Sequence, residues 1–223
     1  DVFSGGYTAS DFGANQVIIV RNEAAKRALP AQLAGALAMT PLEAKGLEFA
    51  DVFAWNFFQD SAAPDRAWGA AAHEIGCPGD AAAAFDARTH LVLSDELKQL
   101  YVACTRARER LVFFDQSATA RKAFFDALLH RRIGRAHDGV FSRTDGSVAL
   151  ARASEAREWR SRGTQFLKRA EDGDYDRASE CFSKSGDEPR RLLCIGLKTL
   201  SQARATDDRA KALTAAYFLA RSE

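Results

Sequence analysis

One stretch of the chain combines clustered arginines with a regular apolar pattern. It runs from Ser94 to Asp115 and reads SDELKQLYVACTRARERLVFFD. Ser94 is a favourable N-cap, and the two acidic residues after it suit the first turn of a helix. The pattern predicts a helix to residue 110 and a short buried strand over 111–114. Apolar residues at helical spacing form one face of this helix: Leu97, Leu100, Tyr101, Cys104 and Leu111.

Arg106 lies on the other side of that expected helix. If each residue turns by about 100°, Arg106 points roughly opposite Leu97. A helix packed on one side and carrying arginine on the other can hold a guanidinium against an anion. Periodicity alone, however, favours the simpler interpretation of a solvated basic face.

Two strings in this region resemble a known family. YVACTRARERL resembles motif VI of the UvrD/Rep-type superfamily 1 helicases, whose helix carries an arginine finger. TPLEAKGLEFADVFAWNFF, from Thr40 to Phe58, resembles motif V of the same family. The two strings occur in the family's order, and LEAKGLEF is most similar to the branch found in large TPR-and-ankyrin-repeat proteins. The resemblance covers about residues 16–115, under half of the chain.

The resemblance implies roles for individual residues in handling ATP. Arg106 would be the catalytic arginine that stabilises charge on the γ-phosphate, and such arginines contribute roughly 10³–10⁵ in rate. Glu48 would contact the ribose, with Gly46 and Thr105 beside it in the nucleotide site. The chain has no G-x-x-x-x-G-K-[ST] loop. ATP and Mg²⁺ would therefore be held mainly by an upstream domain, and this chain is no complete ATPase by itself.

The same resemblance assigns a nucleic-acid coupling loop, with one departure from the family. Thr40 and Lys45 would link the nucleotide cleft to single-stranded DNA or RNA. The family usually has a DNA-contacting His two residues after the Thr, and here the residue is Leu42, followed by Glu43. An aliphatic side chain beside a carboxylate weakens the expected contact with the phosphate backbone.

The coarse pattern predicts an α/β fold for the first part of the chain. Residues 16–21, 37–40 and 51–57 are expected as strands and residues 23–36 as a helix that Pro30 interrupts. Nearly continuous apolar strands are typical of a parallel sheet covered on both faces. The resemblance implies a RecA-like parallel sheet with flanking helices, the second helicase domain.

Several further segments complete this first domain, which we expect to span residues 1–133. Residues 59–88 are rich in Ala, Asp, Gly and Pro, which predicts a surface insertion with one short helix, held down by Trp68. A helix is expected over residues 119–132. Polar, Gly-containing sequence then predicts a linker over residues 134–153.

Residues 154–223 change character and predict an all-α, TPR-like segment. The tetratricopeptide pattern W-x2-L-G-x2-Y…A-x3-F is matched, with Arg162 in the Leu position, by Trp159, Gly163, Phe166, Tyr175, Ala178 and Phe182. Gly163 would allow two helices to approach closely. A third helix is expected from Pro189.

A fourth helix is expected to be capped by Asp207 or Asp208. Its core face would carry Leu213, Tyr217 and Ala220. One and a half to two hairpins need further support, so we expect the array to continue past Glu223 or to lean on the first domain.

Composition excludes several classes of protein. A net charge of +1 argues against a strongly basic nucleic-acid-binding domain, although a local basic groove remains compatible with it. The four cysteines show no CxxC pairing and are expected to be free thiols, and the scattered histidines predict no metal site. The absence of a long apolar run predicts no membrane span. The first residues lack signal-peptide features and look like a cut end, so we expect an intracellular protein of the nucleus or cytoplasm, not a secreted one.

Two functions remain open from the sequence. The first is the C-terminal part of an ATP-dependent superfamily 1 DNA or RNA helicase or ATPase, completed by an upstream Walker domain. In that full-length context the protein would be a hydrolase. The alternative is a non-catalytic, helicase-like docking module of a TPR scaffold, which binds a protein partner through its helical repeats. Glu48 and Arg106 favour the first, whereas Leu42 and the helical tail favour the second.

Overall fold

The chain forms two compact units. The computed structural model describes residues 12–33, 35–74, 76, 85–136, 151–171 and 173–222. The first unit contains the described residues up to Arg152, apart from 13–15. The second contains residues 13–15 and the described residues from Ala153 onward. Each unit is described separately below.

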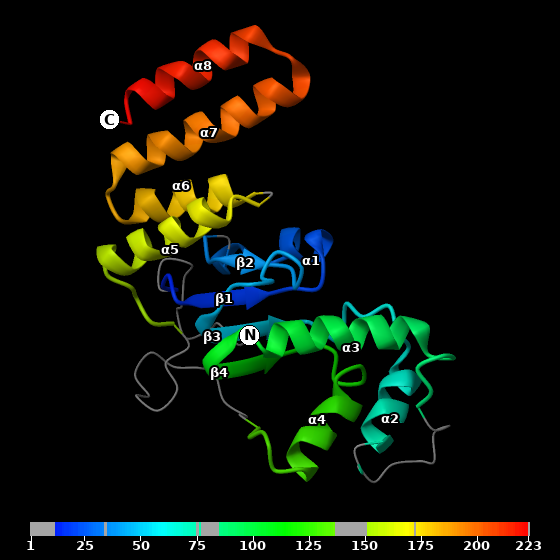
Figure 1. The fold of residues 1–223 in the computed structure, drawn as a ribbon. Coiled ribbons are helices and arrows are strands. Elements are labelled where there is room, and N and C mark those ends of the chain that lie inside the picture. Colours follow the sequence, from blue (N-terminus) through cyan, green and yellow to red (C-terminus); the bar gives the residue numbers. More distant parts are fainter. Residues whose placement is uncertain are drawn as a thin grey trace. The chain divides into compact units, whose positions relative to one another are not determined.

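The first unit is an α/β structure built on a four-stranded parallel sheet (Figure 1). The strand order is β2-β1-β3-β4, and every pair of neighbours is parallel. The strands are β1 (Gln16–Ile19), β2 (Ala38–Met39), β3 (Phe49–Trp55) and β4 (Ala107–Phe114). Six of the seven β3 residues and all four β1 residues are buried, as expected for central parallel strands. The predicted α/β class is confirmed.

Helices connect and flank these strands. They are α1 (Glu23–Arg27), the 3-10 turn η2 (Ala31–Leu33), α2 (Asp65–Glu74), α3 (Leu91–Cys104) and α4 (Lys122–His130). The single helix expected over 23–36 is divided, because Pro30 separates α1 from η2. The short helix expected in the 59–88 insertion is α2. Residues 75 and 77–84 of that insertion lie outside the described part.

Aromatic side chains hold α2 and α4 against the sheet. The Phe58 ring, just after β3, lies 5.0 Å from Trp68 of α2 and 4.7 Å from Phe124 of α4, between ring centroids. Phe113 of β4 lies 5.2 Å from Phe124. Trp68 is only 2% exposed. The prediction that Trp68 anchors the insertion is therefore confirmed.

The prediction of a helix over residues 94–110 is wrong at both ends. Helix α3 begins at Leu91, after His90, and Ser94 is inside it. It ends at Cys104, and β4 begins at Ala107, where it pairs with Phe49 of β3. Thr105 and Arg106 thus form the connection between α3 and β4. Because Arg106 is not part of the helix, the prediction that it lies on the helix face opposite Leu97 is wrong. Tyr101, expected on the packed face, is 70% exposed.

The second unit is a series of four helices (Figure 1). They are α5 (Ala156–Arg169), α6 (Asp174–Lys184), α7 (Glu188–Thr206) and α8 (Arg209–Ala220), and each helix packs on the next in the series. Helix α5 starts with a capping box between Glu155 and Glu158, and Asp187 and Asp208 cap α7 and α8. Of the two caps proposed for the fourth helix, Asp208 is the correct one.

A glycine marks the contact within each helical pair. A Cβ on Gly163 would lie 2.9 Å from the Phe182 ring, and a Cβ on Gly196 would lie 2.8 Å from the Leu219 side chain. The close approach predicted at Gly163 is thus confirmed, and α7 and α8 repeat it. Ala178 and Phe182 of α6 are spaced like Ala215 and Leu219 of α8, although the sequence pattern of the second pair is too weak to show this repetition beforehand.

The predicted core face of α8 is wrong. Leu213 is 74% exposed and Tyr217 is 56% exposed, and Ala220 is exposed as well. Ala215, fully buried, faces the core instead, together with Leu219 against Gly196 of α7. Helix α8 carries apolar residues on both sides, so periodicity alone does not show which side is buried. A prediction based on the larger side chains overlooks Ala215, the small residue that permits close packing.

Candidate functional site

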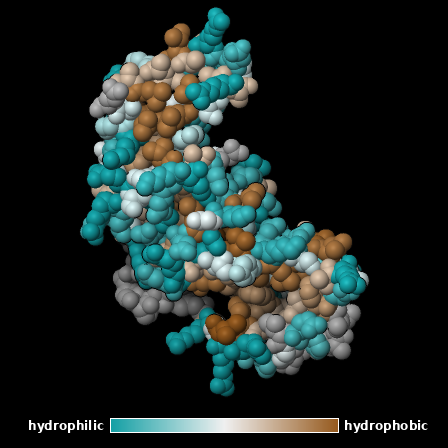
Figure 2. Space-filling view, in the orientation of Figure 1, coloured by the Kyte–Doolittle hydropathy of each residue, from teal (hydrophilic) through white to brown (hydrophobic). Residues whose placement is uncertain are grey.

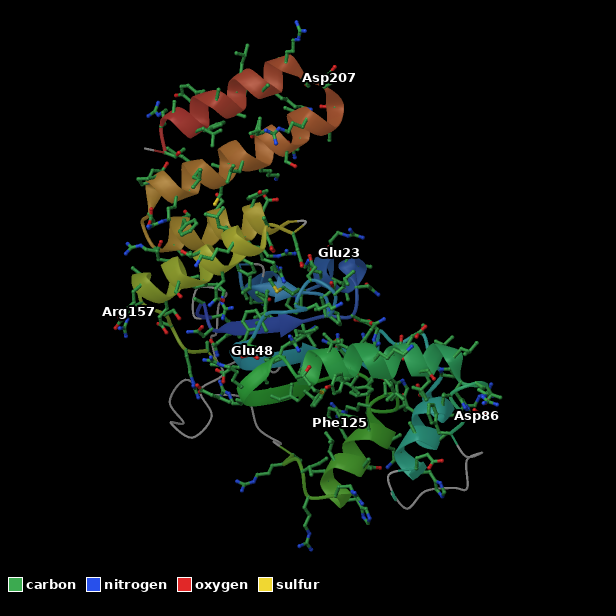
Figure 3. The ribbon with its side chains drawn as sticks, viewed as in Figure 1. Glu23, Glu48, Asp86, Phe125, Arg157 and Asp207 are labelled. Atoms are coloured by element: carbon green, nitrogen blue, oxygen red, sulfur yellow. The ribbon has the colours of Figure 1, made fainter. Side chains whose placement is uncertain are left out.

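The structure brings Glu48 and Arg106 to one end of the sheet. Glu48 directly precedes β3 and Arg106 directly precedes β4, and these strands are parallel neighbours. The Phe49 N–H donates to the Arg106 carbonyl at 2.9 Å. Glu48 is exposed, and Figure 3 labels it among the side chains. Two motifs that are distant in the sequence therefore meet at the amino-terminal edge of the sheet.

The Arg106 guanidinium is held by its own connection and by the strand beside it. Its Nη1 donates to the Leu47 carbonyl at 3.0 Å, its Nε to the Val102 carbonyl at 3.1 Å and its Nη2 to the Thr105 hydroxyl at 3.0 Å. A guanidinium has five N–H donors. Three of them bond in this way within the described residues, and the group keeps donors for an acceptor from outside the chain.

Thr105 ends helix α3. Its hydroxyl donates to the carbonyls of Tyr101 at 2.9 Å and Val102 at 3.1 Å. The last carbonyls of a helix lack partners inside it, so side chains that bond them stabilise its end. Thr105 is thus next to Arg106 and orients it, which is a supporting position. Thr105 is exposed, and its predicted place in the nucleotide site stays a prediction.

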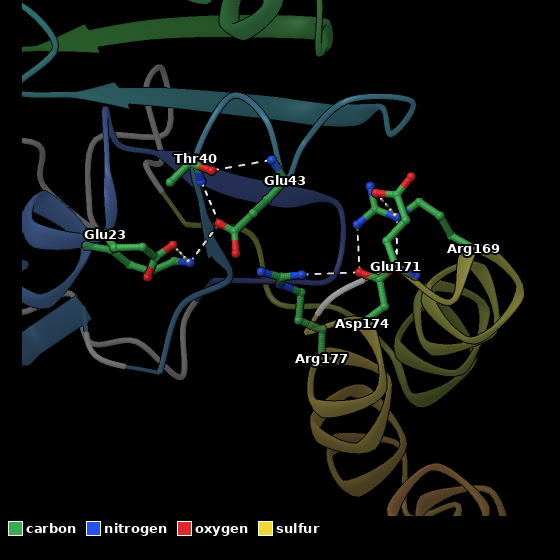
Figure 4. A network of polar contacts seen from close by, with 8 residues as sticks. Glu23, Thr40, Glu43, Arg169, Glu171, Asp174 and Arg177 are labelled. Carbon is green, nitrogen blue, oxygen red and sulfur yellow. Dashed lines mark hydrogen bonds and ion pairs between the residues drawn. The ribbon is translucent and has the colours of Figure 1, made fainter. Parts of the chain in front are cut away.

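Thr40 and Glu43 form a reciprocal cap before the turn that follows β2. The Thr40 N–H donates to the Glu43 carboxylate at 2.8 Å, and the Glu43 N–H donates to the Thr40 hydroxyl at 3.3 Å (Figure 4). Lys26 Nζ also contacts this carboxylate at 2.7 Å. The backbone N–H and the hydroxyl of Thr40 therefore both stabilise this turn.

Gly46 and its neighbours complete this turn. Gly46 has a φ of +79°, a conformation that glycine adopts without strain. No atom lies within 4 Å of the position of an added Cβ, so the backbone angle and not space explains the glycine. Lys45 is exposed, and Leu42 is 78% exposed. The loop thus presents a large apolar side chain where the helicase family has a polar one.

A buried ionic cluster lies at the opposite, carboxyl-terminal edge of the sheet. Arg21, just after β1, pairs with Glu96 of α3 at 2.7 Å and donates twice to the Phe57 carbonyl, at 2.6 and 2.8 Å. Arg21 and Glu96 are 7% and 5% exposed. Glu96 in turn accepts bonds from the Ser61 hydroxyl and from the Ala62 N–H.

The pKa values of Arg21 and Asp60 are shifted in this cluster. Burial lowers the pKa of Arg21 to about 10, although the nearby carboxylates of Glu96, Asp60 and Asp115 oppose the shift. Burial, followed by the charge of Asp115, raises the pKa of Asp60. Asp115 accepts the N–H groups of Phe58 at 2.8 Å and Gln59 at 3.0 Å. Ligands of α/β sheets usually bind at this edge. Here Arg21 pairs with Glu96, although its Nη1 makes no hydrogen bond among the described residues.

Sequence reasoning missed this cluster. Arg21 ends an otherwise apolar run, and that is the only signal in the sequence. Its partner Glu96 sits on a remote helix and reads as an ordinary first-turn acid of the helix expected from Ser94. The cluster consequently shows that the three-dimensional pairing of charges is not encoded in local spacing.

The second unit contains its own buried arginine contacts. Arg162, in the position where the tetratricopeptide pattern has Leu, is 3% exposed. Its Nε donates to the Ala14 carbonyl at 2.8 Å and its Nη2 to the Asn15 side chain at 3.1 Å. The departure from the pattern therefore serves to bind residues 13–15, which belong to this unit.

A second arginine contact fixes the turn between α5 and α6. Asp174, fully buried, pairs with Arg169 at 2.6 Å and with Arg177 at 3.2 Å (Figure 4). Its carboxylate also accepts the Glu171 N–H at 3.1 Å. Two arginines and a backbone donor saturate this carboxylate, so its role is structural.

Other classes of site find little support among the described residues. No cluster of three or more His, Cys, Asp or Glu residues is placed there to hold a metal. Cys104, Cys181 and Cys194 are free, as expected, whereas Cys77 lies outside the described part. Nor is any helix in that part long and apolar enough to cross a membrane.

Fold and site together define a two-part chain: an α/β unit with a parallel sheet and a unit of helical hairpins. The chain is 31% identical over 210 residues to the human protein "TPR and ankyrin repeat-containing protein 1". That similarity covers 85% of this chain, while the chain spans only 7% of the relative's length. No protein-family profile matches the chain, and no solved structure matches it.

Proposed function

We propose that this chain is a protein-interaction module of a large repeat protein, in which a helicase-like α/β unit is joined to TPR-like helical hairpins. The repeated hairpin carries the proposal. Gly163 against Phe182 and Gly196 against Leu219 build the same close helix contact twice, and repeats of this kind typically stack to form binding surfaces. The similarity to a protein named for its TPR and ankyrin repeats supports the same role.

The polar groups of the α/β unit also favour a docking role. Thr40 and Glu43 bond each other, and the buried Arg21 pairs with Glu96. The exposed Leu42 lies where the helicase family that this chain resembles has a residue that contacts a nucleic acid strand. A loop that presents an aliphatic side chain to solvent suits a protein surface better than a phosphate backbone.

One observation supports a second candidate, the trans-acting half of an ATPase with a RecA-like fold. Arg106 and Glu48 meet at the amino-terminal edge of the sheet, and Arg106 is oriented by three hydrogen bonds. An oriented guanidinium at this edge suits a nucleotide held by a neighbouring domain. In this candidate, ATP and Mg²⁺ bind mainly upstream, Arg106 stabilises charge on the γ-phosphate, Glu48 contacts the ribose, and a DNA or RNA strand couples through Thr40 and Lys45.

ATP hydrolysis by the full-length protein separates the two candidates. The measurement is made with and without single-stranded DNA or RNA, for the natural protein, Arg106→Ala and the control Arg108→Ala. Arg108 is exposed on β4 two residues away, so its loss changes charge without removing the oriented group. The interaction module predicts no hydrolysis that depends on Arg106. A loss of at least about a hundredfold in turnover with Arg106→Ala alone would instead establish the ATPase.

A further inference from the structure

Residues 13–15 are bound by side chains at the start of α5. The Ala14 N–H donates to the Ser154 hydroxyl at 3.1 Å, and the Ala14 carbonyl accepts a hydrogen bond from Arg162 Nε at 2.8 Å. Asn15 Nδ2 donates to the Glu158 carboxylate at 3.1 Å, and the Asn15 side-chain oxygen accepts from Arg162 Nη2 at 3.1 Å. Both backbone groups of Ala14 and both ends of the Asn15 amide are thus bound within the helical unit.

The repeat pattern does not explain Arg162, because tetratricopeptide sequences have Leu at this position. Arg162 is only 3% exposed, and burying a guanidinium is unfavourable unless hydrogen bonds compensate for the lost water. Hydrophilic residues predominate over α5 in Figure 2, and Arg157, Arg160 and Ser161 are exposed on this helix. The buried arginine is therefore a feature of the packed side, where the segment that it binds accounts for it.

The segment that α5 holds leads directly into β1. Residues 13–15 belong to the helical unit, whereas Phe12 before them and Gln16 after them belong to the α/β unit. Phe12 is 3% exposed, and its ring lies 5.4 Å from the Phe53 ring, between centroids. Gln16 is the first residue of β1. Because the chain is anchored on both sides of the segment, a displacement of residues 13–15 acts on β1 through the covalent chain.

Gln16 connects the amino-terminal end of β1 to the rest of the sheet. Its side chain donates to the fully buried Asp51 of β3 at 2.8 Å and accepts the Arg152 N–H at 2.8 Å. Asp51 pairs in turn with Arg110 of β4 at 2.9 Å. Hydrogen bonds to a charged group contribute more than those between neutral groups. A shift of Gln16 would therefore disturb a buried carboxylate that is shared by three strands.

We propose that residues 13–15 couple α5 to the amino-terminal end of β1. While α5 holds the segment, the start of β1 is fixed. A partner that displaces α5 or the segment loosens Gln16 and its contact with Asp51. Coupling of this kind is a free energy that links two places in a protein, and it has to be measured. The inference rests on the proposed interaction function and names the route by which partner binding would reach the α/β unit.

Amide hydrogen exchange of the full chain, followed by NMR for single residues, tests the coupling. Arg162→Leu restores the residue of the repeat pattern and removes two bonds to the segment. We expect exchange at Val17 in β1 to become at least about tenfold faster, while Phe182 in α6 stays within about twofold. Asn15→Ala removes the contact from the other side without changing α5, so it should also accelerate Val17 and keeps the test decisive if Arg162→Leu disturbs the helix. The two effects should not multiply in the double variant, because both remove one contact.

Two controls separate coupling from a general loss of stability. Arg157→Leu makes the same chemical change at a side chain of α5 that is 81% exposed, and it should leave exchange at Val17 unchanged. Val112 in β4 reports on the α/β unit as a whole. The proposal is overturned if neither Arg162→Leu nor Asn15→Ala accelerates Val17, if Val112 accelerates as much as Val17, or if Arg157→Leu has the same effect. None of these measurements needs a partner or ATP, so the coupling can fail while the interaction function stands.

Discussion

The two units of this chain bury their charges in different settings. The α/β unit keeps ionic groups inside: Arg21 with Glu96 at one edge of the sheet, and the fully buried Asp51 with Arg110 at the other, 2.9 Å apart. The helical unit buries Asp174 against Arg169 and Arg177 at the turn between two helices. Both units leave large apolar side chains in solvent, among them Leu42 and Tyr101 in the α/β unit and Leu213 and Tyr217 in the helical unit.

Buried ion pairs and exposed apolar side chains suit different roles. The buried pair of Arg21 and Glu96 joins the end of β1 to α3, so its charges stabilise one arrangement of the sheet and that helix. An exposed apolar side of a helix has unfilled packing capacity, which favours association. Under the proposed function, association would use exposed apolar side chains, and Arg106, with its oriented guanidinium, is the candidate for chemistry in the α/β unit.

The largest decrease in the free energy of unfolding should come from removing one partner of the buried Arg21–Glu96 ion pair. Glu96→Ala leaves Arg21 buried without its carboxylate, and breaking a buried ion pair in this way costs about 3–5 kcal/mol of the free energy of unfolding. Urea unfolding followed by tryptophan fluorescence measures the loss, since Trp55 and Trp68 belong to this unit.

Two further variants sharpen that result. Lys98→Ala removes an ion pair to Asp95 in which both side chains are more than 70% exposed, and it should cost less than about 1 kcal/mol. The double variant Arg21→Met/Glu96→Met removes both charges and should recover much of the lost stability. A double variant as unstable as Glu96→Ala would show that packing, not the unpaired charge, causes the effect.

Local patterns in the sequence were enough to predict the strands and the helical hairpins. The apolar runs before Arg21 and around Phe53 predict buried strands because a central parallel strand excludes water from both faces. Gly163 was identified from its place in a repeat pattern. The end of α3 was not predictable in this way: apolar periodicity continues past Cys104, whereas Thr105 and Arg106 stop the helix by side-chain bonds to its carbonyls.

For the candidate site, the two motifs do lie next to each other, but not for the reason that the pattern predicts. Motif order placed Glu48 and Arg106 in one site, and pairing of β3 with β4 does bring them together. Their orientation, however, follows from a connection and not from a helix face. The cluster around Arg21 escaped detection since its partners are brought together only by tertiary structure.

A decrease in stability of intermediate size is expected when the close contact between Gly163 and Phe182 in the helical unit is changed. Gly163→Ala places a methyl group 2.9 Å from the fully buried Phe182 ring, and such overpacking costs about 1–3 kcal/mol. Thermal unfolding by circular dichroism measures it. Gly69→Ala is the matched control in α2, where nothing lies within 4 Å of the new atom. That change should stabilise the chain by about 0.5–1 kcal/mol, and a similar gain at Gly163 would contradict the close contact.

The smallest change in the free energy of unfolding is expected at Asp187, the N-cap of α7, and it depends on pH. The Asp187 side chain accepts the Arg190 N–H at 3.2 Å, and the carboxylate pairs with Arg160 at 3.0 Å. Burial alone would raise the pKa of Asp187, but the Arg190 hydrogen bonds and the two arginine charges lower it on balance. The folded pKa is therefore below the unfolded value of about 3.9. The stabilisation is complete above that value and is lost as the pH falls through the folded pKa.

Asp187→Ala should accordingly reduce the free energy of unfolding by about 1 kcal/mol at neutral pH. The difference from the natural chain should shrink as the pH falls below about 4. Asp187→Asn keeps a side-chain oxygen for the cap but loses the charge, so most of the stability should remain at neutral pH and its pH dependence should be weaker. Urea unfolding across this pH range distinguishes the two contributions. An Asp187→Ala deficit that stays constant into acid would show that the carboxylate charge contributes nothing and that the cap bond alone stabilises α7.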